Sequence, residues 1–177
     1  MATGDAIFAD EATIWFAPAG TVGADLAANG KVITTYVSNV EDGGGEKSTE
    51  SIPHFGGAFV NRRKPQEQFT VDLEVTPRHG ADSTIFDKIR FGQGIAADGA
   101  GDDFVVGMIV IQVTDGTNTE WRAFNNVDCT NFDSSFQASE ERKGTLMFKF
   151  SPADENGVSN IHVGNASAVT TELTSWS

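Results

Sequence analysis

The chain has 177 residues, of which 25 are acidic and 12 basic, giving a net charge of -13 at pH 7. This acidity disfavours nucleic-acid binding, because phosphates would be repelled. The single cysteine excludes an intrachain disulfide, and no stretch approaches the roughly 18 apolar residues of a membrane span. The length suits one domain, residues 1–177. The first residues lack the basic region of a signal peptide, so we expect synthesis in the cytoplasm.

Strand-like segments separated by turn residues fill the first half of the chain. A short apolar run at 13–16 ends at a Pro-Gly turn, and a β-branched run covers 31–40. Residues 67–75 alternate, with apolar residues on one face and a polar set on the other, namely Gln68, Thr70, Asp72 and Glu74. This alternation predicts a strand with one solvent-facing side.

The second half continues in the same way. Residues 104–113 are apolar on both faces, which predicts a central strand or one covered on both sides. A turn at 115–118 then makes 104–127 a predicted hairpin. Two further strands are predicted at 132–136 and 145–150.

One helix is predicted, over about residues 82–91. Asp82 or Ser83 would cap it, Gly92 would end it, and it carries an apolar stripe of Ile85, Phe86 and Ile89. The expected fold class is therefore mainly β, a β-sandwich or barrel with one short flanking helix.

The segment from about 42 to 66 is a long arm between two predicted strands. Its glycines and prolines argue against a core element, but its large apolar side chains argue against a disordered linker. We therefore interpret it as an arm that orders against a partner. Its basic triplet, Arg62 to Lys64, is either a solvated loop tip or a patch that docks on an acidic surface of another copy.

No motif predicts catalysis, a cofactor or a metal site. Residues 92–97 match a dinucleotide fingerprint only in letters, because they follow a helix instead of opening one. The acidic stretch 98–103 lacks the ligand spacing of a calcium loop. The histidines and the cysteine stand alone in the sequence, at His54, His79, His162 and Cys129. We expect the protein not to be an enzyme.

The order of these features resembles a known family over roughly residues 5–160. A glycine-rich arm joins two strands, a capped helix and late hairpins follow, and FKFSPADENGVSNI (148–161) closes the domain. This pattern resembles the tail tube protein, or major tail protein, of long-tailed bacteriophages with non-contractile tails. That family is related in architecture to type VI secretion tube proteins.

The resemblance implies hexameric rings that stack into a hollow tube in the virion tail, through which DNA passes without specific binding. It implies other tail proteins at the tube ends, a tape measure protein in the lumen before ejection, and no membrane partner. Gln68, Thr70, Asp72 and Glu74 would face the lumen. The inter-ring arm would use Glu46, Lys47, Ile52, Phe55, Phe59, Arg62, Arg63 and Lys64. Residues 163–177 have no counterpart in the pattern, and would be an extra contact or a loose tail.

A rival interpretation is a β-sandwich module that binds carbohydrate or decorates a virion. Its support is the strand content and three tryptophans, since aromatic side chains on a sandwich often stack on sugars. These are Trp15, Trp121 and Trp176. A third interpretation, an enzyme, has only the abundance of carboxylates in its favour.

Overall fold

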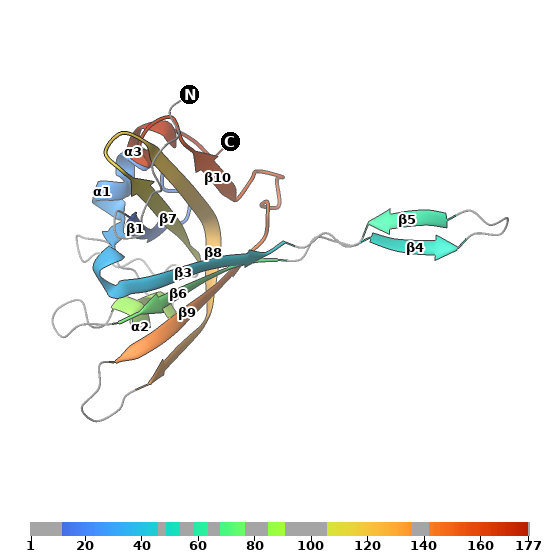
Figure 1. Cartoon of the computed structure of the whole chain (residues 1–177), viewed down its shortest axis with the longest axis horizontal. Helices are drawn as coiled ribbons and strands as arrows, with labels where there is room; N and C mark the ends of the chain where they lie inside the picture. Colours follow the sequence, from blue (N-terminus) through green and yellow to red (C-terminus); the bar gives the residue numbers. More distant parts are fainter. Residues whose placement is uncertain are drawn as a thin grey trace.

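One large antiparallel sheet forms the body of the described structure (Figure 1). The computed structural model describes residues 12–45, 49–53, 59–63, 68–76, 85–90, 106–135 and 142–176. The sheet has eight strands in the order β2-β1-β7-β8-β9-β6-β3, with β10 pairing with β8. Their bounds are β1 Ala12–Pro18, β2 Lys31–Val32, β3 Val37–Gly44, β6 Phe69–Val75, β7 Val106–Thr114, β8 Thr119–Ser135, β9 Lys143–Phe150 and β10 Ile161–Gly164. The mainly β prediction is confirmed. No helix in the described ranges is long and apolar enough to cross a bilayer.

Among the described residues, five short helical segments accompany the sheet, where the sequence predicted one. They are η2 Gly23–Asp25, α1 Leu26–Asn29, η3 Thr34–Tyr36, α2 Ile85–Arg90 and α3 Val169–Glu172. Only α2 corresponds to the predicted helix. The others consist of three or four residues each, too short to show a helical periodicity in the sequence.

The two ends of the sheet order are joined by one stretch of chain. β2 and β3 lie at opposite ends but follow each other in sequence, linked by η3. The N–H of Ile33 donates to the carbonyl of Ile14 at 2.8 Å, and the N–H of Thr76 donates to that of Tyr36 at 2.7 Å. The sheet therefore curves into a barrel-like layer. The single strand predicted over 31–40 is wrong, because this stretch crosses from one sheet edge to the other.

β8 is a 17-residue strand shared by the two halves of the sheet. Its first half pairs with β7 and β10 and its second half with β9. It bends at Asn126, whose φ of 53° is a left-handed conformation that asparagine tolerates better than most residues. Asn126 Nδ2 also donates to Asn160 Oδ1 at 2.8 Å. The 104–127 hairpin is confirmed in its described part, but the separate strand at 132–136 is wrong, since it is the end of β8.

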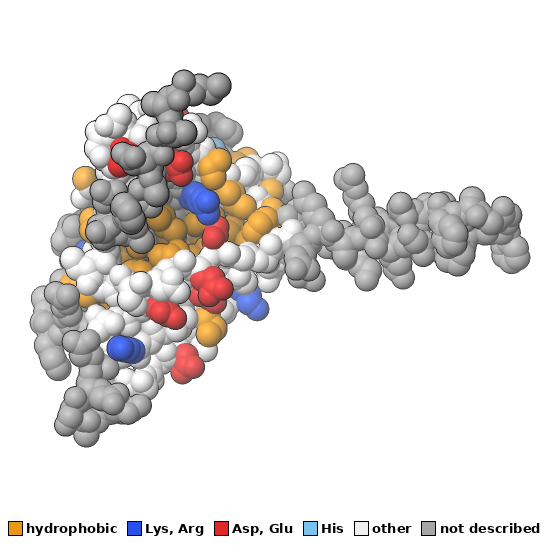
Figure 2. Space-filling view, viewed as in Figure 1, with side chains coloured by type: hydrophobic (Ala, Val, Ile, Leu, Met, Phe, Trp, Pro, Cys, Tyr) orange, Lys and Arg blue, Asp and Glu red, His pale blue; other side chains and the backbone are white. Residues whose placement is uncertain are grey.

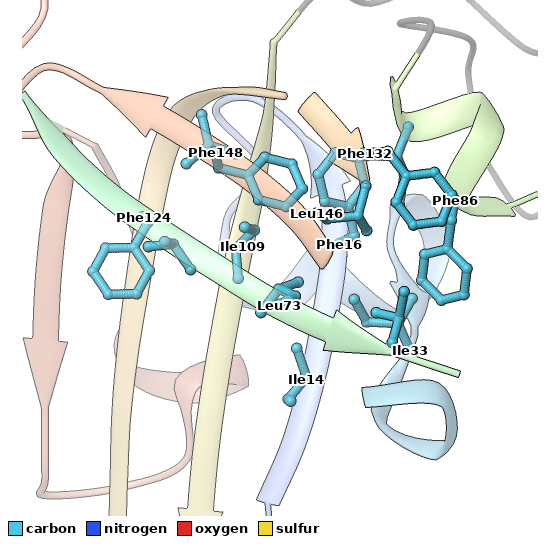
Figure 3. Packing of buried hydrophobic residues seen from close by; sticks show 14 of the residues in the cluster. Ile14, Phe16, Ile33, Leu73, Phe86, Ile109, Phe124, Phe132, Leu146 and Phe148 are labelled. Atoms are coloured by element: carbon cyan, nitrogen blue, oxygen red, sulfur yellow. The ribbon is translucent and has the colours of Figure 1, made fainter. Parts of the chain in front are cut away.

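The main core fills the space inside the curved sheet (Figure 3). Helix α2 packs on this core through Phe86, whose ring centroid lies 5.7 Å from that of Tyr36 and 6.2 Å from that of Phe132. The predicted apolar stripe is confirmed, because its three residues are buried, namely Ile85, Phe86 and Ile89. The predicted capping residues, Asp82 and Ser83, lie outside the described residues.

A second apolar cluster covers the other face of β1, β7 and β8. In β7, Ile109 points into the main core while Met108 and Val110 belong to this second cluster. The full set of buried members is Ala17, Leu26, Met108, Val110, Trp121, Ala123, Val169 and Leu173. Helices α1 and α3 supply part of it. The prediction that the strand in 104–113 is covered on both sides is thus confirmed.

The C-terminal segment is fixed to the second cluster. The N–H of Val169 donates to Gln112 Oε1 at 2.9 Å, and Trp176 Nε1 donates to the carbonyl of Thr21 at 2.9 Å. Val169 itself is fully buried. Residues up to Trp176 are therefore part of the packed domain, and the loose-tail alternative is wrong.

The arm contains regular structure that the sequence did not predict. Strands β4 (Thr49–Pro53) and β5 (Phe59–Arg63) form a two-stranded sheet of their own, which we call the ribbon. It projects beyond the ends of β3 and β6 (Figure 1). At Gly45, where the chain leaves β3, φ is 70° and an added Cβ would lie 2.2 Å from the ring of Phe69. Glycine is therefore required at the start of the arm.

Candidate functional site: an acidic sheet face and a projecting ribbon

The polar residues of β6 lie on the side of the sheet that faces away from the core. Val71, Leu73 and Val75 are buried, while Asp72 is half-buried and Glu74 is exposed. The alternation predicted for 67–75 is confirmed. The predicted lumen set therefore shares one side, apart from Gln68, which is exposed and just precedes the strand.

Three cross-strand rows extend this polar surface over β8, β9, β6 and β3. We call the twelve residues of these rows the acidic face. The register gives the rows as Asp128-Lys149-Thr70-Gly43, Asn131-Met147-Asp72-Glu41 and Asp133-Thr145-Glu74-Asn39. Five of the twelve are carboxylates and one is an ammonium group. In the lower part of Figure 2, where β3, β6 and β9 lie, acidic side chains stand among a few basic ones.

Asp72 sits at the centre of the acidic face, and its environment disfavours its charge. Partial burial raises its pKa above the ordinary value, and the carboxylate of Glu41 directly opposite raises it further. The ammonium group of Lys149 acts in the other direction but does not cancel these effects. Asp72 therefore holds its proton more tightly than a free carboxyl, first because it is partly buried and second because another carboxylate faces it.

A groove of about 590 Å³ opens between β3 and the strands β7, β8 and β10. Its apolar lining includes Val40, Ile111, Val113 and Val163, and the last of these is 69% exposed. Across it, Arg122 Nη1 lies 2.9 Å from Asp42 Oδ2. Its lining also includes Glu120. In Figure 2 this region appears as apolar side chains around one basic group, with acidic groups beside it.

The predicted arm residues fall partly on the ribbon. Ile52 is on β4, and Phe59, Arg62 and Arg63 are on β5. In the register, Ile52 lies opposite Val60, Glu50 opposite Arg62 and Thr49 opposite Arg63. The other four predicted arm residues lie outside the described residues, namely Glu46, Lys47, Phe55 and Lys64.

No metal-ligating cluster of His, Cys, Asp and Glu occurs among the described residues. His54 and His79 lie outside them, and the ring of His162 lies 4.7 Å from that of Trp176. Burial raises the pKa of the Cys129 thiol to about 11, so it remains a thiol at neutral pH.

The three tryptophans all pack in or against the second cluster. Trp121 is a buried member of the second cluster, and Trp15 and Trp176 pack against it. The indole nitrogen of Trp121 donates to Glu172 Oε2 at 2.8 Å. These aromatic side chains contribute to internal packing, so the sugar-binding interpretation keeps only the strand content in its favour.

Sequence reasoning missed Glu41, Asp128 and Asp133 as members of the acidic face. Alternation along 145–150 placed Lys149 on the polar side of its strand, but nothing local showed which strands were neighbours. The same alternation in β3 puts Glu41 on the polar face, and it would have been recognised had that strand been placed at 37–44.

Comparison with known proteins identifies similar folds. Neither a family model nor a curated protein sequence matches the chain. Among solved structures, it resembles a chain of the sheath/tube terminator of PVC, an extracellular contractile injection system, in its extended state, with a TM-score of 0.54 and 16% identity. That match covers 94% of this chain and 100% of the other.

Two further structures match about as well. One is the PVC sheath-tube complex, with a TM-score of 0.54, 15% identity and coverage of 94% of this chain and 95% of the other. The other is the tube terminating cap of the anti-feeding prophage, with a TM-score of 0.53, 13% identity and the same coverage. The chain therefore shares the fold of proteins in phage-tail-like particles.

Proposed function

We propose that this protein is a structural subunit of a bacteriophage tail tube. Six copies would form a ring, rings would stack into a hollow tube, and the acidic face would line the lumen. The observation that carries the proposal is the acidic face itself, a largely polar surface on four strands whose other side is core.

The edges of this four-stranded region suit a ring. β3 is the last strand in the sheet order, so its outer edge has no strand partner among the described residues. At the other side, β8 beyond Asp128 pairs only with β9 in the described part of the chain. One copy thus offers two different strand edges, and joining unlike edges is a heterologous contact that can close into a ring.

An acidic lumen suits the passage of DNA. Carboxylates on the wall repel phosphates, and screening limits the repulsion to about 8 Å at physiological salt, the range in which sticking would occur. DNA would then slide without being bound. The tape measure protein would occupy the lumen before ejection, and other tail proteins would close the ends.

The arm would join one ring to the next. A two-stranded ribbon is at best marginally stable alone in water, and β4 and β5 form a sheet separate from the main one. Packing against a neighbouring copy would stabilise it. Because the matched structures come from contractile systems, assignment to a non-contractile tail rests on the sequence resemblance and belongs to this proposal.

Negative-stain electron microscopy of the concentrated protein tests the proposal. We expect hollow tubes or stacked rings with six-fold end views. Microscopy of tails from particles carrying the protein would show whether a sheath surrounds the tube. Protein that stays monomeric at high concentration, even with added ring nuclei, would contradict the proposal.

A further inference from the structure

We propose that the groove between β3 and β10 receives the ribbon of a second copy of the chain. This inference rests on the proposed function, because it names the surface on which the arm docks. The groove has an apolar lining and stands open, with Val163 mostly exposed beside it. Leaving such a surface in water costs free energy, which an apolar occupant would recover.

The ribbon has the composition that the groove requires. Ile52 and Val60 form an apolar cross-strand pair in its register, and Arg62 and Arg63 follow along β5. The groove lining contains two carboxylates, Asp42 and Glu120, against one guanidinium, Arg122. The apolar pair is followed by two arginines, only one of which lies opposite an acid, Glu50, so the ribbon matches an apolar groove with an excess of acid. In a chain with a net charge of -13, such a basic segment is rare.

The occupant must come from another copy. Asp42 lines the groove and lies on β3, the strand from whose end the arm departs. The ribbon projects away from that end (Figure 1), so it does not fold back over its own groove.

The reach of the arm suits a neighbouring ring. Nine residues, 45–53, span at most about 30 Å when extended, and a domain of this size is roughly 30–40 Å across. If the next copy is displaced by about one domain diameter in the direction in which the arm projects, its groove lies within reach of the ribbon. Such a head-to-tail contact repeats without closing, as stacking requires.

Cysteine cross-linking between two tagged populations tests the docking. One population carries Val163→Cys at the groove and the other carries Val60→Cys on the ribbon, and the two are mixed and assembled. A short bismaleimide is then added at about neutral pH, where Cys129 stays protonated and reacts slowly. The control replaces Val163→Cys with Val32→Cys, since Val32 is also an exposed valine, at 48%, and lies outside the groove lining.

We expect the mixed cross-linked dimer to form at least about tenfold more from Val163→Cys than from Val32→Cys, because docking raises the effective concentration of the two thiols. Tubes that assemble but give equal yields would overturn the groove assignment and leave the tube proposal intact. If electron microscopy of the same mixtures shows no rings or tubes, the tube proposal fails and the groove proposal fails with it.

Discussion

At the level of single residues, Asp72 illustrates the unfavourable electrostatics of the acidic face. It lies directly opposite Glu41 on the neighbouring strand, and both burial and this carboxylate raise its pKa. Like charges that face each other across two strands destabilise a sheet. A sheet selected only for stability would not pair them, so the pairing is consistent with a surface whose charge is used.

We predict that Asp72→Asn stabilises the folded protein at about pH 7. A pKa raised on folding means that the folded state binds the proton more tightly than the unfolded state does. Ionised Asp72 therefore lowers stability at neutral pH, and the wild type recovers this loss as the pH falls through the raised pKa towards about 4. Urea unfolding at several pH values measures the effect.

The difference between Asp72→Asn and the wild type should shrink as the pH falls. Glu74→Gln is the control, because it removes the same charge at an exposed position of the same strand, and we expect it to change stability by only about 0.5 kcal/mol or less. A difference for Asp72→Asn that grows on acidification would show that Asp72 is stabilised as a carboxylate.

The charge of the acidic face also gives a prediction about DNA passage. Asp72→Lys combined with Glu74→Lys should allow assembly but attract phosphates, and we expect infectivity to fall on the order of tenfold or more. The control, Asp25→Lys with Glu155→Lys, makes the same change in charge at exposed positions off this face. Plaque counts from tube-containing particles measure the effect. Equal infectivity for both pairs would place the acidic face outside the lumen.

At the level of elements, the ribbon is the one part of the described strands that does not join the main sheet. It pairs within itself, while β3 and β6 pair with each other up to Gly44 and Phe69, before the arm begins. The main sheet therefore ends before the arm begins and does not depend on the arm for its pairing. Removing residues 46–66 should leave the domain folded, since every pair that joins β3 to β6 lies outside them.

We predict that replacing residues 46–66 with a two-residue turn leaves the domain folded and abolishes stacking. Strands β3 and β6 would then be joined as a hairpin. Circular dichroism and a melting curve check the fold, and electron microscopy checks for tubes. As a matched control, Ile52→Val with Val60→Ile keeps the arm apolar and should still stack. Tubes formed by the deletion variant would show that the arm is not the contact between rings.

At the level of the whole molecule, two apolar clusters share one sheet. The main core lies inside the curved sheet, and the second lies on the other face of β1, β7 and β8 under α1, α3 and the C-terminal segment. The C-terminal segment thus completes the domain by covering a face that would otherwise be exposed. This accounts for the apolar residues on both sides of β7.

A pair of valine substitutions tests the role of the C-terminal segment. Val169 is fully buried under this segment, while Val163 is 69% exposed. We predict that Val169→Ala lowers the free energy of unfolding by about 1–3 kcal/mol, because it removes buried apolar surface and leaves a small cavity. Val163→Ala should change it by about 0.5 kcal/mol or less. Chemical denaturation of both variants measures the two free energies of unfolding. Equal losses of stability would contradict the packing role of the C-terminal segment.

The sequence predicted strands best where one side is wet and the other is buried. The alternation at 67–75 and at 145–150 survives in β6 and β9, because burial on one side is a local property of a strand. The split of 31–44 into β2, η3 and β3 depends on contacts with Ile14 and Thr76, which are distant in sequence. The acidic face depends on register between strands, which no single strand encodes.

The packing of the three tryptophans has a consequence for optical measurements. All of them belong to the second cluster or pack against it, whereas the only tyrosine, Tyr36, packs against the main core. Tryptophan emission therefore reports the environment beneath the C-terminal segment. Far-ultraviolet circular dichroism follows the strands as a whole. If the segment detaches before the sheet melts, the two signals will change at different denaturant concentrations.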